Sequence, residues 1–536
     1  AGSVYTPTKD TSGSSFDPTF DVQYLPEQDA GLLKKYFMVE GEQLLQLFRF
    51  CPQCGLKIPG GNTVRLLQQG TAPVVHFLCA RCSLEGEQTK RWEGQKRATL
   101  VPNDRMYKGN VVAAVAAITT GLRFVELERW AKQFGLALFS KSTFWRYFER
   151  TKPAVEEVYG RHQSEVLSKV REHSKDGLDL AADGAYDSRE NISGRMETEG
   201  ITRLLQWVVG QGMIVRSLTT DRSRSIAKLL RDLKEEVGPI THYYDGWHIV
   251  KWLGNKLREE SKKRGCEVVA AWIEKVKTHL WNSMKLDAGE GEKRRHAFNT
   301  CLMHVRDKHV WEQTTETGPY TSCGHAPLQG SRPEVLTEGS RAFSRFREVV
   351  LNRRLQEDLL KASSRGGTSV CEAKNALDRL YCRKEIYYPI STYHFYAKMA
   401  TMHFNSLRLA EMAGTRNVER EVEVRRKYLS RTSRVTFKSS IHHQWRDEVT
   451  EAVLRRRERQ LQEGDDDDDE MEALSTETRN MIEAEDIYEN ISFEDIRIQD
   501  LLEHEPELDI AEGTEYSDID AVLHIARAMF PDLPHP

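Results

Sequence analysis

MIVRSLTTD, residues Met213–Asp221, is the apolar run Met213–Leu218 closed by an acid, Asp221, and further along the chain YYDGWH places Asp245 three residues before His248. This order is typical of a strand, a helix, a second strand and a second helix. Upstream, the run GLDLAA (residues 177–182) ends directly before another acid, Asp183, and downstream Glu372 begins a helical stretch. The sequence therefore predicts an α/β core whose strands carry carboxylates at their ends.

Three of these acids have the chemistry of a metal site. Asp183, Asp221 and Glu372 would supply the carboxylate oxygens that Mg²⁺ or Mn²⁺ prefers, and pairs of such ions carry out phosphodiester chemistry. Each acid also has a simpler interpretation, because helix caps and surface carboxylates are the commoner use of acidic residues. The residues alone leave both interpretations open.

Charge is distributed unevenly along the 536 residues, although the net charge is only −4. Residues 464–536 hold 24 Asp and Glu against three Arg, a net of −21, so residues 1–463 carry +17. A basic body releases counterions when it meets phosphates, which favours DNA or RNA over a neutral metabolite as the partner. Solvated Lys and Arg faces are the alternative for any single cluster. We expect residues 464–536 to form a disordered acidic tail, with an amphipathic helix around Ile519–Met529.

Composition also limits the protein class. No run approaches 18 apolar residues, and residues 1–30 form a polar segment that predicts a flexible lead without a signal core. We therefore expect a soluble, intracellular protein with no membrane partner. Nine cysteines, an odd number with two tight pairs, fit reduced thiols and metal ligands better than a disulfide framework. The chain begins with Ala1 rather than Met, which suggests a processed, tagged or partial chain.

Two C-x-x-C pairs near the N-terminus predict a zinc ribbon over residues 31–105. Cys51 and Cys54 form the first pair, Cys79 and Cys82 the second, and a strand-like segment lies between them. Four thiolates satisfy a tetrahedral Zn²⁺ ion. The alternative is two chance pairs of reduced cysteines.

Residues 106–170 predict a helical domain of three short helices, the second and third separated by Gly135. The third opens at a capping serine, Ser140, and carries Lys141, Arg146 and Arg150. This arrangement suits a helix-turn-helix that contacts DNA through those three basic residues. An ordinary three-helix packing unit fits the sequence equally well.

A second metal site is suggested in the mostly helical region 251–365. His304 and His309 are five residues apart, and Cys323 and His325 follow after a polar loop. A five-residue step passes well beyond one helix face, so the two His could share a Zn²⁺ ion only where a helix ends or frays. Scattered polar side chains are the alternative.

From Cys51 to about Asn405 the chain resembles the Kolobok superfamily of cut-and-paste DNA transposases, which have an RNase H-like catalytic core. The pieces that carry the resemblance occur in order and are weak singly but specific as a series: CPQCG and CARC followed by Trp92, the helical Ser-Thr-Phe segment at residues 142–144, Asp183-Gly-x-x-Asp-Ser, Thr220-Asp221-Arg222, Thr241-His-Tyr-Tyr-Asp245-x-Trp-His248, Cys323-x-His325, Thr368-Ser-x-x-Glu372-Ala, and Met402-His-Phe-Asn405.

The resemblance implies a role for each group of residues. It implies that Asp183, Asp221 and Glu372 form a catalytic triad for Mg²⁺ or Mn²⁺. It also implies that Asp245 and His248 are a D-x-x-H signature paired with the H-x4-H of the helical region, although Asp245 stays a rival for the second catalytic acid. The core would then comprise residues 171–250 and 366–463, the second part including a basic segment, with residues 251–365 as a helical insertion.

One departure from the family concerns the first strand. Similar transposases have two further strands between the first Asp and the next helix, whereas this chain has only Gly184–Met196 before the expected helix at Glu197–Val209. Two ordinary strands and their turns would use nearly all of that span. We therefore expect the hairpin to be missing and the strand before Asp183 to lie at an unpaired edge.

The sequence thus predicts a transposase-derived, double-stranded-DNA-binding protein of the nucleus, ancestrally an enzyme of metal-dependent strand cleavage and transfer. The alternative is a domesticated or degenerate copy that binds DNA without cutting, or an adaptor that uses its acidic tail for protein contacts. A homo-oligomer is compatible with either.

Overall fold

The computed structural model describes residues 29–83, 89–102, 104–184, 193–286, 291–323, 333–363, 367–383, 386, 388–425, 432–464 and 474–490. The chain is a mixed α/β protein that divides into two compact units, Ala1–Gln95 and Lys96–Pro536. Among the described residues, no helix combines the length and the apolar character needed to cross a membrane.

The first unit is built on a small antiparallel sheet. Its strands are β1 (Val64–Gln69), β2 (Ala72–Phe77) and β3 (Lys90–Glu93), in the order β1-β2-β3. The two-residue turn between β1 and β2 contains Gly70 at φ 66°, a value that favours glycine. Helix α1 (Gly41–Gln46) and the 3-10 helices η1 (Leu32–Lys34) and η2 (Leu47–Arg49) complete the unit.

A parallel sheet organises the second unit. Strands β4 (Leu178–Ala181), β5 (Val215–Thr220) and β6 (Thr241–Tyr244) run in the order β4-β5-β6. Helix α5 (Ser193–Gly210) connects β4 to β5, and α6 (Arg224–Asp232) and α7 (Lys234–Val237) connect β5 to β6. The strands before Asp183 and Asp221 therefore lie side by side, as β4 and β5. Because the strands are parallel, the residues that follow them meet at one edge of the sheet.

The expected loss of a hairpin after Asp183 concerns residues 185–192, which lie outside the described residues. Within the described part, β4 pairs with β5 on one side and with no second strand. Helix α5 begins at Ser193, four residues earlier than the sequence predicts. On the far side of the sheet, the N–H of Tyr244 donates to the carbonyl of Lys361 at 2.7 Å, so a short segment extends the sheet beyond β6.

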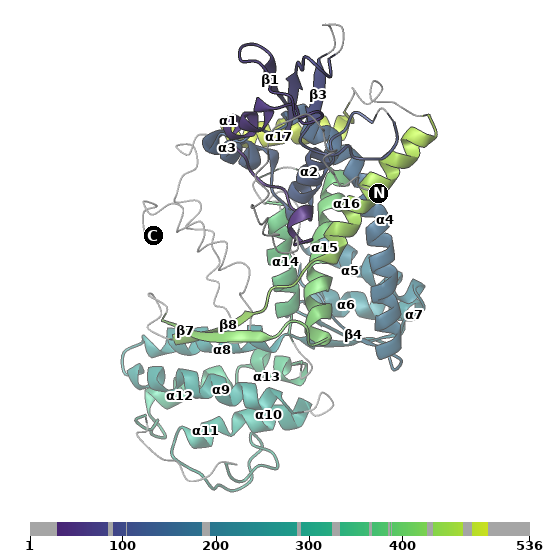
Figure 1. The fold of residues 1–536 in the computed structure, drawn as a ribbon. Coiled ribbons are helices and arrows are strands. Elements are labelled where there is room, and N and C mark those ends of the chain that lie inside the picture. The colour runs from purple at the N-terminus through teal and green to yellow at the C-terminus, as the bar shows by residue number, and fades with distance from the viewer. Residues whose placement is uncertain are drawn as a thin grey trace. The chain divides into compact units, whose positions relative to one another are not determined.

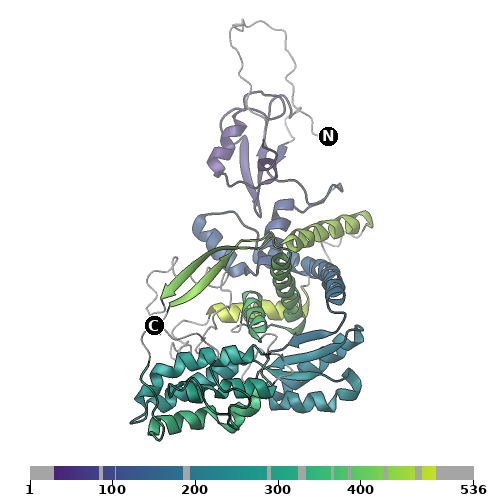
Figure 2. The same ribbon diagram turned by 90° about the horizontal axis from the view of Figure 1, so that it is seen from below.

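A lobe of helices follows β6, as the sequence predicts for residues 251–365. Figures 1 and 2 show this lobe beside the parallel sheet. Its buried face centres on Leu253, Phe298 and Phe346. The elements are α8 (Gly246–Ser261), η3 (Glu267–Trp272), α9 (Ile273–Met284), α10 (Gly291–Asn299), α11 (Cys301–His304), α12 (Arg341–Val350) and α13 (Arg353–Leu360).

The remaining helices pack around one apolar cluster that includes Trp145, Phe148 and Met399. The expectation of three short helices at residues 106–170 is wrong for the third, because α4 has 33 residues and continues to His173. Its apolar positions recur at helical spacing past Pro153, and Ala154, Val155 and Val158 are buried. The helices of this cluster are α2 (Lys108–Thr120), α3 (Phe124–Phe134), α4 (Lys141–His173), α14 (Ser369–Tyr381), α15 (Ile390–Met412) and α16 (Gln444–Gln462).

Two features near the C-terminus differ from the sequence predictions. An antiparallel ribbon of β7 (Val418–Arg425) and β8 (Thr432–Lys438) lies in a segment for which the sequence predicts only basic character. The prediction of a disordered acidic tail is also wrong for residues 476–490, because helix α17 (Thr476–Asn490) forms there. Met481 is buried in the helical cluster and Lys152 Nζ donates to Thr478 Oγ1 at 3.1 Å, so local burial outweighs the acidic composition. The amphipathic helix predicted at residues 519–529 lies outside the described residues.

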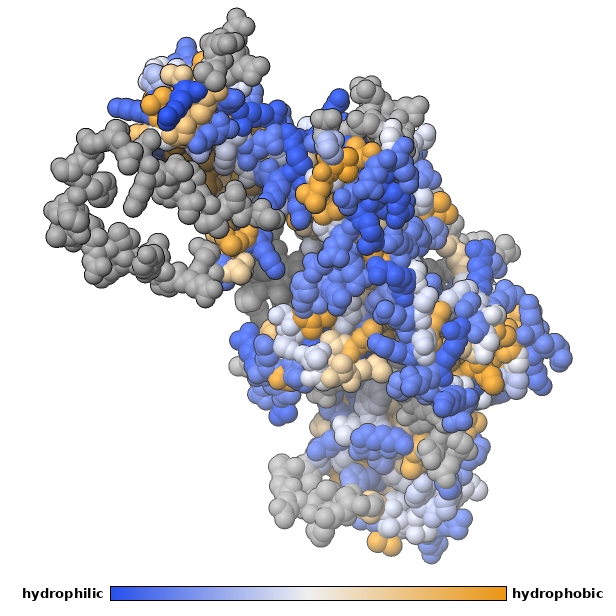
Figure 3. Space-filling model, turned by 45° about the vertical axis from the view of Figure 1, so that its right-hand side comes forward, coloured by the Kyte–Doolittle hydropathy of each residue, from blue (hydrophilic) through white to orange (hydrophobic). Residues whose placement is uncertain are grey.

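Charged and polar side chains cover much of one face of the molecule (Figure 3). On the face in Figure 3, hydrophilic residues predominate and hydrophobic residues form small separate groups. This pattern agrees with the 29% of charged residues in the sequence.

Candidate functional site

An acid follows each of the three parallel strands, and two of these acids line one pocket. Asp183 follows β4, Asp221 follows β5 directly, and Asp245 follows β6 and caps α8. A pocket of about 510 Å³ is lined by Asp183 and Asp221, by His248 of α8 and by Glu197 of α5. The fold therefore brings together two of the three acids of the predicted triad at the edge where the strands end.

Glu372, the third acid of the predicted triad, lies in the first turn of α14 as the sequence suggests. Its carboxyl is in electrostatic contact with the other acids. Burial first, and then the negative charges of Asp245 and Asp221, raise the pKa of Glu372, while His248 and Lys251 oppose the rise. The site thus concentrates negative charge that a cation would neutralise.

Asp183 responds most strongly to this concentration of charge. Burial first, and then the carboxylates of Asp221 and Glu372, raise its pKa from near 3.8 to about 6. Half-buried carboxylates that repel one another in this way fit a divalent cation, because oxygen ligands and opposite charge remove the repulsion. The group of ligand atoms that lies within 4.8 Å at this pocket, however, is Asp221, Asp245 and His248 rather than the predicted triad.

His248 is tied to the second acid. Its Nε2 lies 3.0 Å from Asp221 Oδ1. Burial alone would lower the pKa of His248, but the hydrogen bond and the charge of Asp221 outweigh burial and raise it. The imidazole therefore holds one oxygen of Asp221 in place, and the surrounding acids favour its protonated form.

Asp245 has a different role from His248, the other residue of the D-x-x-H motif, because its contacts hold the backbone rather than a pocket side chain. It is 3% exposed, and its carboxylate accepts hydrogen bonds from the backbone N–H of Trp247 at 2.7 Å and from both the N–H and the hydroxyl of Thr368, at 2.8 and 2.7 Å. A Cβ on Gly367 would come within 2.8 Å of the same carboxylate. Asp245 thereby fastens the N-terminus of α14, and with it Glu372, to the end of β6.

The rival role for Asp245, as a metal ligand, also has geometric support. One ligand atom from each of Asp221, Asp245 and His248 can be chosen so that all lie within 4.8 Å of one another. Both oxygens of Asp245 nevertheless already accept hydrogen bonds. A residue that must keep three donors satisfied is better suited to positioning than to ligation.

Replacing Asp183 by Asn should stabilise the metal-free protein. The folded-state pKa of about 6 lies above the ordinary value near 3.8, so Asp183 destabilises the fold by an amount that grows between about pH 4 and pH 6 and stays constant at higher pH. After allowance for solvent screening, we expect Asp183→Asn to add about 1–2 kcal/mol at pH 8. The gain should vanish below about pH 4, where the wild-type acid is neutral in both states. Thermal unfolding with a chelator present measures this.

Mn²⁺ provides the internal control for that measurement. The ion should raise the melting temperature of the wild-type protein at pH 8 and raise that of Asp183→Asn much less, because ligands that bind only the folded state stabilise it. A variant that is less stable than the wild type at pH 8 without metal would contradict the electrostatic account of Asp183.

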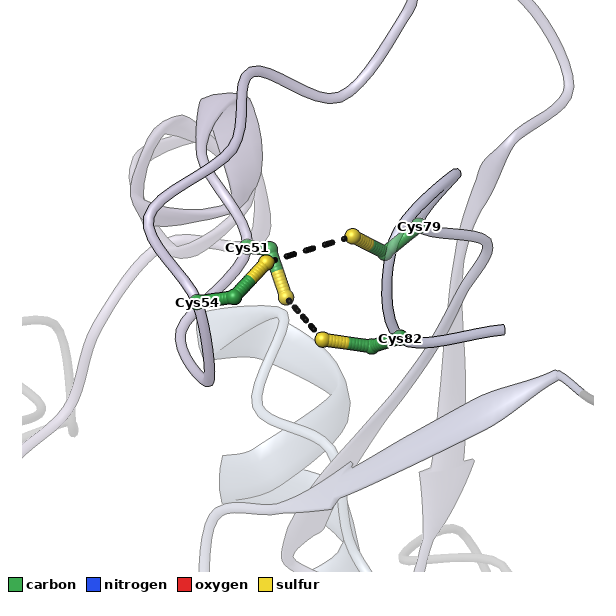
Figure 4. A group of neighbouring side chains, drawn as sticks. All are labelled: Cys51, Cys54, Cys79 and Cys82. Atoms are coloured by element: carbon green, nitrogen blue, oxygen red, sulfur yellow. Dashed lines mark hydrogen bonds between the residues drawn. The ribbon is translucent and has the colours of Figure 1, made fainter. Parts of the chain in front are cut away.

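The four cysteines of the predicted ribbon form one cluster. Figure 4 shows Cys51 and Cys54 on one loop and Cys79 and Cys82 on the other, with their sulfurs turned toward each other. The Sγ atoms of Cys51 and Cys82 are 3.8 Å apart, and those of Cys54 and Cys79 are 3.5 Å apart. All four ligand atoms lie within 4.8 Å, and this cluster could hold a metal such as zinc.

The loops around the cluster are shaped for thiolates. Gly55, at φ 72°, closes the first knuckle with its N–H donating to the Cys51 carbonyl at 2.8 Å. Donation from the Cys82 backbone N–H, despite burial, lowers the pKa of Cys79 to about 6, whereas a hydrogen bond to Cys54 and burial raise the pKa of Cys82. The loops thus bring four sulfur atoms together, and a bound cation would neutralise the negative charge of their thiolate forms.

The second suggested metal site is assembled in part. His304 is the last residue of α11, and the turn beyond it contains Asp307 at φ 57°. The helix thus ends where the two His could share an ion. Ligand atoms of His304, His309 and Cys323 lie within 4.8 Å of one another, and His309 Nδ1 is 3.1 Å from Cys323 Sγ. His325, the fourth suggested ligand, lies outside the described residues.

The basic residues suggested for DNA contact lie in the first three turns of α4. Ser140 caps this helix by accepting from the Thr143 N–H at 3.3 Å. Arg146 is exposed, whereas Lys141 and Arg150 are partly buried, and Arg150 contacts the sulfur of Met106. Arg146 is therefore the most accessible of the three.

Sequence reasoning missed several residues that line the acidic pocket. Glu197 lies in the first half of α5, and Lys251, Trp252 and Asn255 lie on α8. The three α8 residues could have been predicted from their spacing, because residues three, four and seven positions after His248 lie on the same helical face. Glu197 carried no comparable signal, since its distance from the strand ends depends on the undescribed connection.

No family model, curated protein or solved structure matches this chain.

Proposed function

We propose that this chain is a transposase-derived protein that binds double-stranded DNA and cleaves and transfers its strands at Asp183, Asp221 and Glu372. The observation that carries the proposal is the pocket that Asp183 and Asp221 line together with His248 where parallel strands end. Glu372 supports it, because its charge contributes to the raised pKa of Asp183. Carboxylates from two strands and a helix are the arrangement expected of a metal-dependent phosphodiester site.

The strand order supports an RNase H-like core. In that fold the order is 3-2-1-4-5, and the first acid follows strand 1 and the second follows strand 4. The order β4-β5-β6, with Asp183 after β4 and Asp221 after β5, corresponds to positions 1, 4 and 5. The elements in between, helix α5 and the α6–α7 pair, provide parallel crossovers.

Each side chain has a distinct task in the proposed reaction. Asp183, Asp221 and Glu372 would hold Mg²⁺ or Mn²⁺, which supplies activation of the attacking oxygen and stabilisation of the leaving oxygen. His248 fixes the orientation of Asp221 through their 3.0 Å contact. Asp245, through Thr368, sets the position of the helix that carries Glu372.

Cleavage of an end-labelled duplex in Mg²⁺ or Mn²⁺ tests the proposed activity. The expected result is nicked or cut strands that require the metal. A wild-type protein that binds the duplex but leaves it intact in both metals would contradict the proposed cleavage activity.

The second candidate is a DNA-binding protein that no longer cuts. It is favoured by β4, which pairs on one side only within the described part of the chain, since an unsupported edge would loosen the acid that follows it. In this case zinc at the four cysteines and the basic residues of α4 would serve DNA contact. Both candidates place the protein in the nucleus, where its substrate lies.

Truncating the acidic tail should tighten DNA binding. Because α17 packs on the helical cluster, the cut belongs after Asn490 rather than at residue 464. Residues 491–536 carry twelve acidic residues and two Arg, a net of −10, and removing them takes away an intramolecular competitor of phosphate. We expect duplex affinity to rise roughly tenfold at low salt and the gain to shrink as salt rises.

Fluorescence anisotropy with a labelled duplex at several salt concentrations measures this effect. A chain of the same length in which the tail acids are replaced by Asn and Gln is the matched control, and it should bind as tightly as the truncated chain. Equal affinities of the full-length and truncated proteins at low salt would contradict the competitor role.

A further inference from the structure

Helix α8 turns one continuous stripe of side chains toward the acidic pocket. Lys251, Trp252 and Asn255 line the pocket together with His248. Steps of three, four and seven residues place these side chains on one helical face. Since His248 binds Asp221, the stripe begins at the acids and extends along α8 for roughly 10 Å.

Trp252 forms an aromatic wall of the pocket. Its ring is partly buried against the apolar cluster of the helical lobe and also lines the open pocket. The guanidinium of Arg222 lies 5.4 Å from the ring centroid and is itself held by an ion pair with Asp358. Arg222 Nε is buried and has no hydrogen-bond partner in the described part of the chain. A fixed cation thus orients the indole at the edge of the acidic site.

Lys251 supplies the charge that a phosphate needs there. Its ammonium lies 4.7 Å from the ring centroid of Trp247, so the side chain is held along the helix surface. Lys251 is also close enough to oppose the rise in the pKa of Glu372. The carboxylates repel a phosphate that approaches them, and Lys251 together with His248 reduces this repulsion.

We propose that Lys251, Trp252 and Asn255 bind one unpaired strand of nucleic acid beside the acids, with a base stacked on Trp252 and a phosphate near Lys251. Both faces of a base within a duplex are covered by its neighbours, so an indole in a pocket wall can stack only on a base that has left the stack. The inference rests on the proposed function for the presence of nucleic acid and specifies that the strand at this site is unpaired.

Binding of a fluorescein-labelled single strand and of a blunt duplex of the same sequence, in Ca²⁺, tests this role. We expect Trp252→Leu to weaken single-strand binding about tenfold or more, and Trp252→Phe to retain most of it, because stacking depends on an aromatic face. Duplex binding should change little in both variants. Trp207→Leu is the matched control, since Trp207 is an exposed tryptophan of α5 that does not line the pocket. Circular dichroism checks that each variant is folded.

A second measurement needs no variant. A strand containing 2-aminopurine should lose fluorescence when it binds the wild-type protein, because stacking on an indole quenches the base. Wild-type binding without quenching, or equal single-strand affinity of folded Trp252→Leu and the wild type, would overturn the inference and leave the proposed cleavage site standing. Binding of neither strand nor duplex would overturn both.

Discussion

Asp221→Asn should abolish metal-dependent cleavage while leaving DNA binding nearly intact. Asp221 sits at the centre of the site, between β4 and β6 and in contact with His248 at 3.0 Å. An amide cannot replace a carboxylate as a metal ligand of the same charge, so the rate should fall at least about a thousandfold, roughly 4 kcal/mol in the barrier. Duplex affinity should stay within about threefold, because the change removes a negative charge and no phosphate contact.

Gel analysis of an end-labelled duplex and anisotropy on the same protein sample measure the two effects together. Asp232→Asn is the matched control, since Asp232 is an exposed acid at the end of α6 and does not line the pocket. It should cleave like the wild type. If Asp221→Asn retained full metal-dependent activity, the nuclease would be a contaminant or the site would lie elsewhere.

Cys51→Ser should remove one zinc ion per chain and unfold the first unit. Cys51 and Cys79 are buried inside the core of that unit, so the metal cluster and the apolar core share residues. Structural zinc contributes on the order of 10 kcal/mol of folding free energy to small domains. Elemental analysis should show the zinc content falling by about one ion per chain, and limited proteolysis should cut within residues 29–95.

Cys382→Ser provides the control for the zinc experiment. Cys382 is a partly buried cysteine at the end of α14, outside the cluster, and its replacement should leave the zinc content unchanged. The second unit should keep its melting transition in both variants. A Cys51→Ser protein with unaltered zinc and an intact first unit would contradict the metal site.

Local pattern predicted much of this structure. The apolar run before Asp221 becomes β5, the run before Asp183 becomes β4, and α3 ends just before Gly135, the residue that the sequence places between the second and third helices. These succeed because strand and helix periodicity, glycine stops and a serine cap are properties of neighbouring residues. Each C-x-x-C knuckle is a local turn of the same kind, and the convergence of the two pairs was predicted from the four ligands that a tetrahedral zinc ion needs.

Features that depend on distant partners were not predictable. Two of the hydrogen bonds that Asp245 accepts come from Thr368, far along the chain, and nothing near Asp245 indicates them. The acidic composition of residues 476–490 predicts disorder. Helix α17 forms there nevertheless, because Met481 packs into the apolar cluster that contains Trp145 and Met399. Likewise α4 continues past its expected end because α15 and α16 cover its apolar face. Such tertiary contacts override local composition.

Anomalous diffraction from crystals grown in Mn²⁺ tests the central claim most directly. The account predicts Mn²⁺ density bounded by the carboxylates of Asp183, Asp221 and Glu372, with His248 in contact with Asp221 and with Asp245 still bound to Thr368. Density confined to Asp221, Asp245 and His248, or no ion at these acids, would contradict it. So would a separation of Asp183 and Asp221 greater than about 12 Å, since oxygen ligands of such ions lie near 2 Å.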